Sequence, residues 1–91
     1  MFRSEVTRGM LFTFERPQLL YFWMKNTLVR LDILYFDADG SFINTRTMEP
    51  CTEDPCPSYP SSSPAQYGLE MPAGYVSSSG IGVGWKLGVS E

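Results

Sequence analysis

The sequence predicts a mainly β fold, a small barrel-like single domain with a long Pro/Ser-rich loop and at most one short helical turn. The chain has 91 residues, which suffice for one domain over residues 1–91. Its apolar segments are short and lack helical periodicity, and glycine- and proline-rich turns separate them. With 43% hydrophobic and 19% charged residues, the composition is that of a folded domain rather than a disordered chain.

The first half of the chain is dominated by strand-forming segments. We predict strands at residues 10–16, 21–26, 31–37 and 41–47. The long apolar run after Pro17 is divided near residue 27, because it exceeds the length of one strand. Asp39 and Gly40 signal the turn of a hairpin between the last two strands.

The second half of the chain has a different composition from the first half. Residues 49–65 contain five prolines and four serines, which predicts a long loop without a strand or helix. A strand is predicted at 67–71, followed by one short helical turn within 72–80 that Gly80 closes. Residues 81–89 then complete the domain.

Several function classes are disfavoured by composition. The absence of histidine removes Ser-His-Asp and Cys-His nucleophiles and histidine-bearing metal sites. The seven basic residues are scattered and the net charge is −3, so we expect no nucleic-acid partner. The apolar run at 19–36 contains Lys25, Arg30 and Asp32, so we expect no membrane span. The N-terminal residues also lack the apolar core of an export signal, and no compartment is predicted.

A polar cluster interrupts the apolar strands and is the strongest candidate site. It consists of Lys25, Asn26, Thr27 and Asp32. Polar groups among Leu, Phe and Trp are costly unless they are paired. They could line a concave site for a polar small molecule, with Trp23 or Tyr21 as a stacking face. Alternatively, the amide and hydroxyl satisfy a turn while Asp32 pairs with Arg3 or Arg30.

The acid–base candidates are three carboxylates, Asp32, Glu49 and Glu70. A two-carboxylate hydrolase needs its acids about 5–10 Å apart across the scissile bond. Each of these residues also has a structural interpretation, Asp32 as a paired acid, Glu49 in a loop and Glu70 on the polar face of a strand. Enzymatic activity therefore stays open.

Cys51 and Cys56 enclose four residues in the proline-rich loop. This spacing is compatible with a disulfide. Two free thiols are the second interpretation. A metal site is the third, but without histidine the acidic neighbours would have to complete the ligand set, and we expect no metal.

The block around Trp23 resembles a known family. It reads Phe22-Trp23-Met24-Lys25-Asn26-Thr27, followed by Leu31-Asp32, an apolar strand and Asp39-Gly40. Further matches are Met1-Phe2-Arg3, Gly9-Met10-Leu11-Phe12, Glu49-Pro50, Tyr59, Leu69-Glu70, Pro72-Ala73-Gly74 and Gly80-Ile81. They resemble the prokaryotic family called domain of unknown function 192. The resemblance implies a compact, mostly β barrel-like domain, often exported, with no assigned activity.

The resemblance also leads to an expectation about assembly. Members of that family usually carry a strand before the Met-Phe-Arg motif, whereas this sequence starts within the motif. An unpaired strand edge recruits partners. We therefore expect a homodimer through that edge.

Together these observations favour a non-catalytic β-barrel module that binds a polar small molecule or glycan fragment, without a cofactor. The predicted ligand-binding residues are Arg3, Trp23, Lys25, Asn26, Thr27, Asp32 and Glu70. The alternatives are a small carboxylate-dependent hydrolase and a structural or protein-interaction domain.

Overall fold

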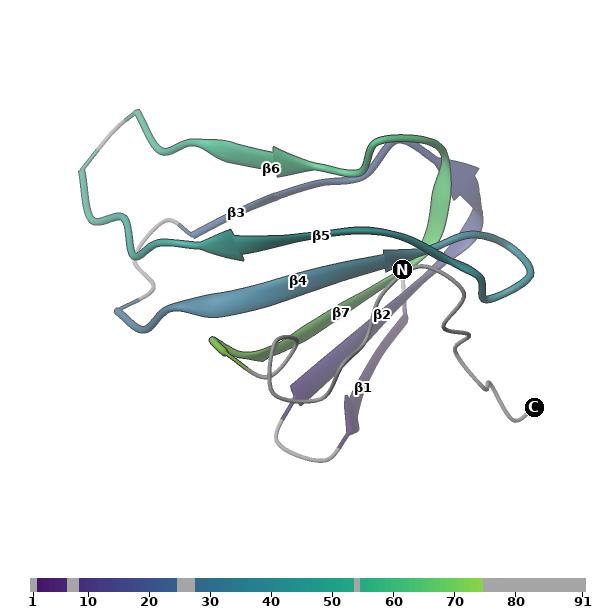
Figure 1. The fold of residues 1–91 in the computed structure, drawn as a ribbon, viewed down its shortest axis with the longest axis horizontal. Helices are drawn as coiled ribbons and strands as arrows, with labels where there is room; N and C mark the ends of the chain where they lie inside the picture. The colour runs from purple at the N-terminus through teal and green to yellow at the C-terminus, as the bar shows by residue number, and fades with distance from the viewer. Residues whose placement is uncertain (1, 7–8, 25–27, 54, 75–91) are drawn as a thin grey trace.

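The computed structural model describes residues 2–6, 9–24, 28–53 and 55–74, with the backbone alone for 2–6. Within these residues seven strands form two sheets (Figure 1). The strands are β1 (Phe2–Val6), β2 (Gly9–Gln18), β3 (Tyr21–Trp23), β4 (Leu31–Phe36), β5 (Phe42–Met48), β6 (Ser58–Pro60) and β7 (Ala65–Pro72). The described chain is thus mainly β, as predicted.

The larger sheet has the strand order β1-β2-β7-β4-β5, and all of its neighbouring strands are antiparallel. The hairpin of β4 and β5 forms where the sequence predicts it. Its turn is held by the Asp37 carboxylate, which accepts hydrogen bonds from the backbone N–H groups of Asp39 and Ser41, both 2.9 Å long. Gly40 has φ of +80° there, a conformation that favours glycine.

The side chains of β4 supply both hydrophobic cores, because successive residues of a strand point to opposite faces. Ile33 and Tyr35 pack into the first core, together with residues of β3 and β6 and their flanks. Leu34 and Phe36 pack into the second core on the other face of the large sheet. All four side chains are fully buried, which explains why β4 is apolar on both faces.

The smaller sheet pairs β3 with β6 and covers the first core (Figure 1). Leu20 and Met24, which flank β3, and Tyr59 in β6 are buried against the large sheet. Within the described residues the two sheets stay separate and do not close into a barrel, so this part of the chain is barrel-like only in the loose sense that one sheet covers another.

Several elements differ from the sequence prediction: β1 is not predicted, and β7 spans Ala65–Pro72 rather than 67–71. The first long strand continues through Pro17 to Gln18, and the strand from Tyr21 ends at Trp23. The predicted loop at 49–65 contains β6, a strand of three residues. A proline is tolerated there because Pro60 closes the short strand. Of the helical turn predicted within 72–80, Pro72 ends β7 and residues 75–80 lie outside the described residues, as does the segment at 81–89.

The described part of the chain has no helix that is long and apolar enough to cross a membrane.

Candidate ligand-binding site

An open pocket of about 600 Å³ lies beside β3, where this strand crosses over β2 and β7. Its lining is mainly aromatic and aliphatic, with one amide and one carboxylate. The lining residues are Phe12, Phe14, Gln18, Leu19, Leu20, Tyr21, Phe22, Trp23 and Glu70. An apolar wall with a few polar groups is the usual composition of a small-molecule site.

The inner wall of the pocket is built around Phe22, which points from β3 toward the large sheet. Its ring lies 5.1 Å from that of Phe12 and 6.5 Å from that of Phe14, centroid to centroid, in edge-to-face contacts. Gly68 in β7 makes this approach possible, because a Cβ atom built there would lie 3.1 Å from the Phe22 ring. Because Gly68 has no side chain, β3 can lie close to the large sheet.

The outer rim of the pocket consists of residues that alternate with the inward-pointing ones. Leu19, Tyr21 and Trp23 are 50%, 63% and 59% exposed. Strand geometry places such alternate side chains on one face. An exposed row of large apolar side chains is a candidate recognition surface.

Two of the predicted site residues come together in this pocket, Trp23 and Glu70. They lie far apart in sequence, and the crossing of β3 over β7 brings them together. The sequence did not single out the neighbouring Phe12, Phe14 and Gln18. The alternation from Leu19 to Trp23 is the one sequence signal that could have indicated the rim.

Asp32 lies on the opposite face of the large sheet from Glu70. Ile33 pairs with Glu70 across the ladder, whereas Asp32 pairs with Met71. Cross-strand partners share a face and neighbours along a strand alternate. Asp32 and Glu70 therefore do not face each other across a cleft, as a hydrolase that uses this pair requires, and Asp32 does not line the pocket. The pair of Asp32 with Glu49 stays a prediction.

The surroundings of Asp32 favour the structural interpretation of this residue. Its side chain is buried, with 3% of its surface exposed. One carboxylate oxygen accepts a 2.8 Å hydrogen bond from Thr47 Oγ1 and the other a 3.1 Å bond from the Gly74 N–H. Arg30, considered above as its partner, instead donates to Glu49 at 3.1 Å in an exposed ion pair.

Four predicted site residues are not placed by the structure. Lys25, Asn26 and Thr27 lie outside the described residues, as does the side chain of Arg3. Their roles stay predictions.

Tyr35, which lies in β4, links the large sheet to the small sheet. Its hydroxyl donates a hydrogen bond to the carbonyl oxygen of Tyr59 in β6. Burial raises the pKa of Tyr35 strongly, the Arg46 guanidinium partly opposes this increase in pKa, and the Glu70 carboxylate adds to it. The phenol therefore remains protonated and can keep donating this hydrogen bond.

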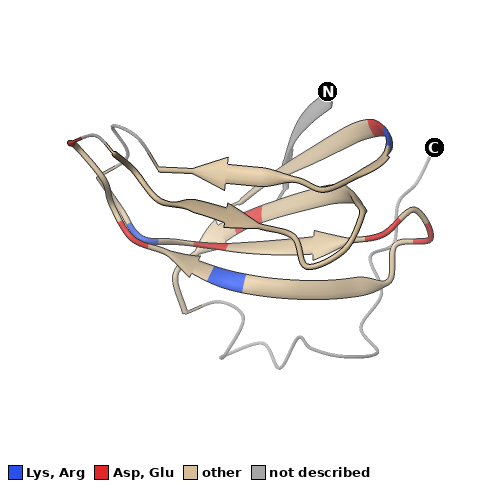
Figure 2. Cartoon of the chain, turned by 90° about the horizontal axis from the view of Figure 1, so that it is seen from above, with Lys and Arg blue, Asp and Glu red and all other residues tan. Residues whose placement is uncertain are grey.

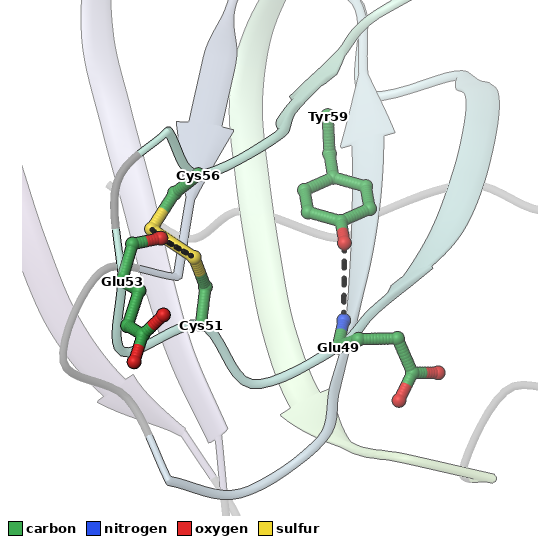
Figure 3. The surroundings of a disulfide bond; sticks show 5 residues. All are labelled: Glu49, Cys51, Glu53, Cys56 and Tyr59. Carbon is green, nitrogen blue, oxygen red and sulfur yellow. Dashed lines mark hydrogen bonds between the residues drawn. A yellow bond between two sulfur atoms is a disulfide. The ribbon is translucent and has the colours of Figure 1, made fainter.

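The two cysteines form a disulfide between Cys51 and Cys56, with a Cα–Cα distance of 5.8 Å (Figure 3). The first of the three interpretations of this pair is thus confirmed. The Glu53 carbonyl oxygen lies 3.3 Å from Cys51 Sγ and 3.7 Å from Cys56 Sγ. These are close contacts rather than hydrogen bonds, because a disulfide sulfur carries no proton.

A comparison with protein families finds a match to DUF192, described as "Uncharacterized ACR", over residues 1–89. The chain belongs to the DUF192 family. The resemblance inferred from the block around Trp23 is therefore confirmed over nearly the whole chain.

Two solved structures share the fold. A protein of unknown function from Novosphingobium aromaticivorans DSM 12444 has a TM-score of 0.76 and 32% identity, over 94% of this chain and 61% of that one. A "putative transcription regulator" from Sinorhizobium meliloti 1021 has a TM-score of 0.75 and 31% identity, over 94% of this chain and 67% of that one. This DUF192 chain thus spans about three fifths to two thirds of these relatives. A comparison with curated proteins finds no match.

Proposed function

We propose that this DUF192 chain is a non-catalytic binding module for a polar small molecule or a glycan fragment. The observation that carries the proposal is the pairing of exposed aromatic rings, Tyr21 and Trp23, with the Glu70 carboxylate around one open pocket.

This composition suits a ligand with an apolar face and a polar rim. A sugar ring presents axial C–H groups that pack against an aromatic ring, and such packing contributes about 1 kcal/mol beyond the area buried. Its hydroxyl groups donate to a carboxylate in charge-assisted hydrogen bonds. Trp23 would supply the stacking face, and Glu70 and Gln18 the polar contacts. The 600 Å³ volume is within the usual range for small-molecule sites.

The relative described as a "putative transcription regulator" raises nucleic-acid binding as a second function. The described basic side chains do not support it for this chain. In Figure 2 the blue Lys and Arg positions of the described chain lie apart from one another, with red acidic positions among them. Phosphate recognition depends on clustered positive charge, and the whole chain carries a net charge of −3.

The proposal is tested by titrating neutral sugars, from glucose to cellobiose, while the fluorescence of Trp23 is recorded. A Trp85→Phe background leaves Trp23 as the single tryptophan. We expect saturable binding, weakened about tenfold by Trp23→Ala (followed by calorimetry) and by Glu70→Gln, since each removes a contact of about 1 kcal/mol or more.

Leu28→Ala is the matched control, because Leu28 is an exposed apolar residue, 76% accessible, outside the pocket lining. It should bind as the parent does. Equal binding by the Trp23→Ala protein, or no binding of any sugar by the parent, would contradict the proposal.

A further inference from the structure

The rim strand of the pocket depends on a very short partner strand. Among the described residues, β3 forms its ladder with β6 alone, over three residue pairs. Two bonds extend this contact by one residue: Ser61 N–H donates to the Leu20 carbonyl at 2.9 Å, and Leu20 N–H donates to Ser61 Oγ at 2.9 Å. A ribbon this short is not stable in isolation. The position of β3, and hence of the rim, therefore depends on what holds β6 as well as on the packing of Phe22 against the large sheet.

β6 is held through both the backbone and the side chain of Tyr59, and Asn44 in β5 adds a 3.4 Å hydrogen bond to the Pro60 carbonyl. The Tyr59 carbonyl accepts the hydrogen bond from Tyr35, and the Tyr59 hydroxyl accepts a 3.1 Å bond from the backbone N–H of Glu49. Glu49 directly follows β5 in sequence. The Glu49–Tyr59 bond thus closes a loop between the two sheets, and this loop contains both cysteines.

The disulfide shortens that loop. Cys51 lies two residues after Glu49 and Cys56 three residues before Tyr59, and Figure 3 shows the disulfide beside the Glu49–Tyr59 bond. Cys51 also packs against the first core. With the disulfide intact, few free backbone bonds separate Tyr59 from its partner, so returning it to the large sheet costs little chain entropy.

The disulfide is placed where a reductant can reach it. Both cysteines are only half-buried, and Thr52, Glu53 and Pro55 between them are exposed. A thiolate can attack one sulfur, break the S–S bond and form a mixed disulfide. A second reductant thiolate then attacks the reductant sulfur of the mixed disulfide and displaces the protein cysteine. Two electrons and two protons thereby pass to the cysteine pair, and the two reductant thiols become a disulfide.

We propose that the oxidation state of Cys51 and Cys56 controls the pocket: the disulfide holds β6, β6 holds β3, and reduction loosens the rim and weakens ligand binding. This inference rests on the proposed binding function. Its mechanical part, the coupling from the disulfide to β3, can be tested without any ligand.

The first experiment measures amide hydrogen exchange by mass spectrometry on the oxidised protein, on the protein reduced with dithiothreitol, and on the Cys51→Ser/Cys56→Ser variant. We expect exchange at residues 20–23 and 58–61 to become about tenfold faster in both open forms, in line with the loop entropy that is lost. Exchange in β2, β4 and β7 serves as the internal control and should change little.

Unchanged exchange at residues 20–23 would overturn the coupling. An equal acceleration in all strands would also overturn it, because the disulfide would then stabilise the whole domain rather than the rim.

The second experiment titrates cellobiose into the oxidised and reduced proteins. We expect the Kd for cellobiose to rise about five- to tenfold on reduction. This increase should not exceed the increase in the amide exchange rate at residues 20–23. An equal Kd for both forms would overturn the control of binding. Binding by neither form, together with selective exchange at residues 20–23, would refute the sugar ligand and leave the coupling supported.

Discussion

At the residue scale, Asp32 is a buried carboxylate at one end of the large sheet. Thr47 and the Gly74 N–H each donate to one of its oxygens. The carboxylate thereby fixes the chain that follows β7 against the start of β4. Its role is the organisation of one end of the sheet, on the face away from the pocket.

We predict that Asp32→Ala lowers the free energy of unfolding by about 3 kcal/mol, since two hydrogen bonds to a buried charged group are lost. Thr47→Val removes one of the two bonds and should cost about half as much. Urea unfolding of the three proteins measures both effects. A midpoint for Asp32→Ala that equals the parent's would show that these bonds contribute nothing to stability.

The burial of Tyr35 leads us to predict that the protein becomes less stable at alkaline pH. In the unfolded chain its phenol ionises near pH 10. Burial raises the pKa of Tyr35 in the folded protein, so the fold disfavours the phenolate. The stability that this preference contributes is complete below about pH 10 and declines as the pH rises above it.

We therefore expect Tyr35→Phe to show a shallower fall in stability between about pH 9 and pH 11 than the parent. At neutral pH this variant should be about 1 kcal/mol less stable, because the Tyr59 carbonyl loses its donor. Urea melts across this pH range provide the measurement, with Tyr67→Phe in β7 as the matched control. Parallel curves for the parent and Tyr35→Phe would contradict the assignment.

At the scale of elements, the seating of β3 on the large sheet decides whether the pocket exists. Phe22 reaches the sheet over Gly68, where a Cβ atom would be 3.1 Å from its ring. Core overpacking of this kind costs about 1–3 kcal/mol. We predict that Gly68→Ala lowers Tm by several degrees and shifts the emission of Trp23, because β3 must move outward.

Gly74→Ala is the control for this prediction. Gly74 has open space around the Cβ position, but its φ of +92° strains any other residue. This variant should lose stability without changing the emission of Trp23. An unchanged emission in Gly68→Ala would mean that Phe22 adjusts without moving the strand.

At the scale of the whole molecule, the open sheet leaves β1 at an edge. Within the described chain β1 pairs with β2 alone, over five residue pairs. Strand edges recruit further strands, and a net charge of −3 opposes association only weakly. We predict a reversible homodimer through this edge, detected by sedimentation over about a hundredfold range of concentration. A single monomeric species at every concentration would refute it.

The sequence by itself determined the fold class, the hairpin of β4 and β5, and the family. These follow from local signals, namely alternating apolar residues, the turn at Asp39 and Gly40, and a distinctive block of side chains. The hairpin could be predicted because its two strands are neighbours in sequence and its turn chemistry is local.

Only the tertiary structure determined which segments that are distant in sequence pair and pack against each other. It paired β7 with β2 and β4, which separates Asp32 from Glu70 by the thickness of the sheet. It made a strand of Ser58–Pro60, because pairing with β3 and burial of Tyr59 outweigh the weak strand tendency of a proline-rich segment. Contacts between distant segments depend on register and packing, and no local pattern encodes these before the chain has folded.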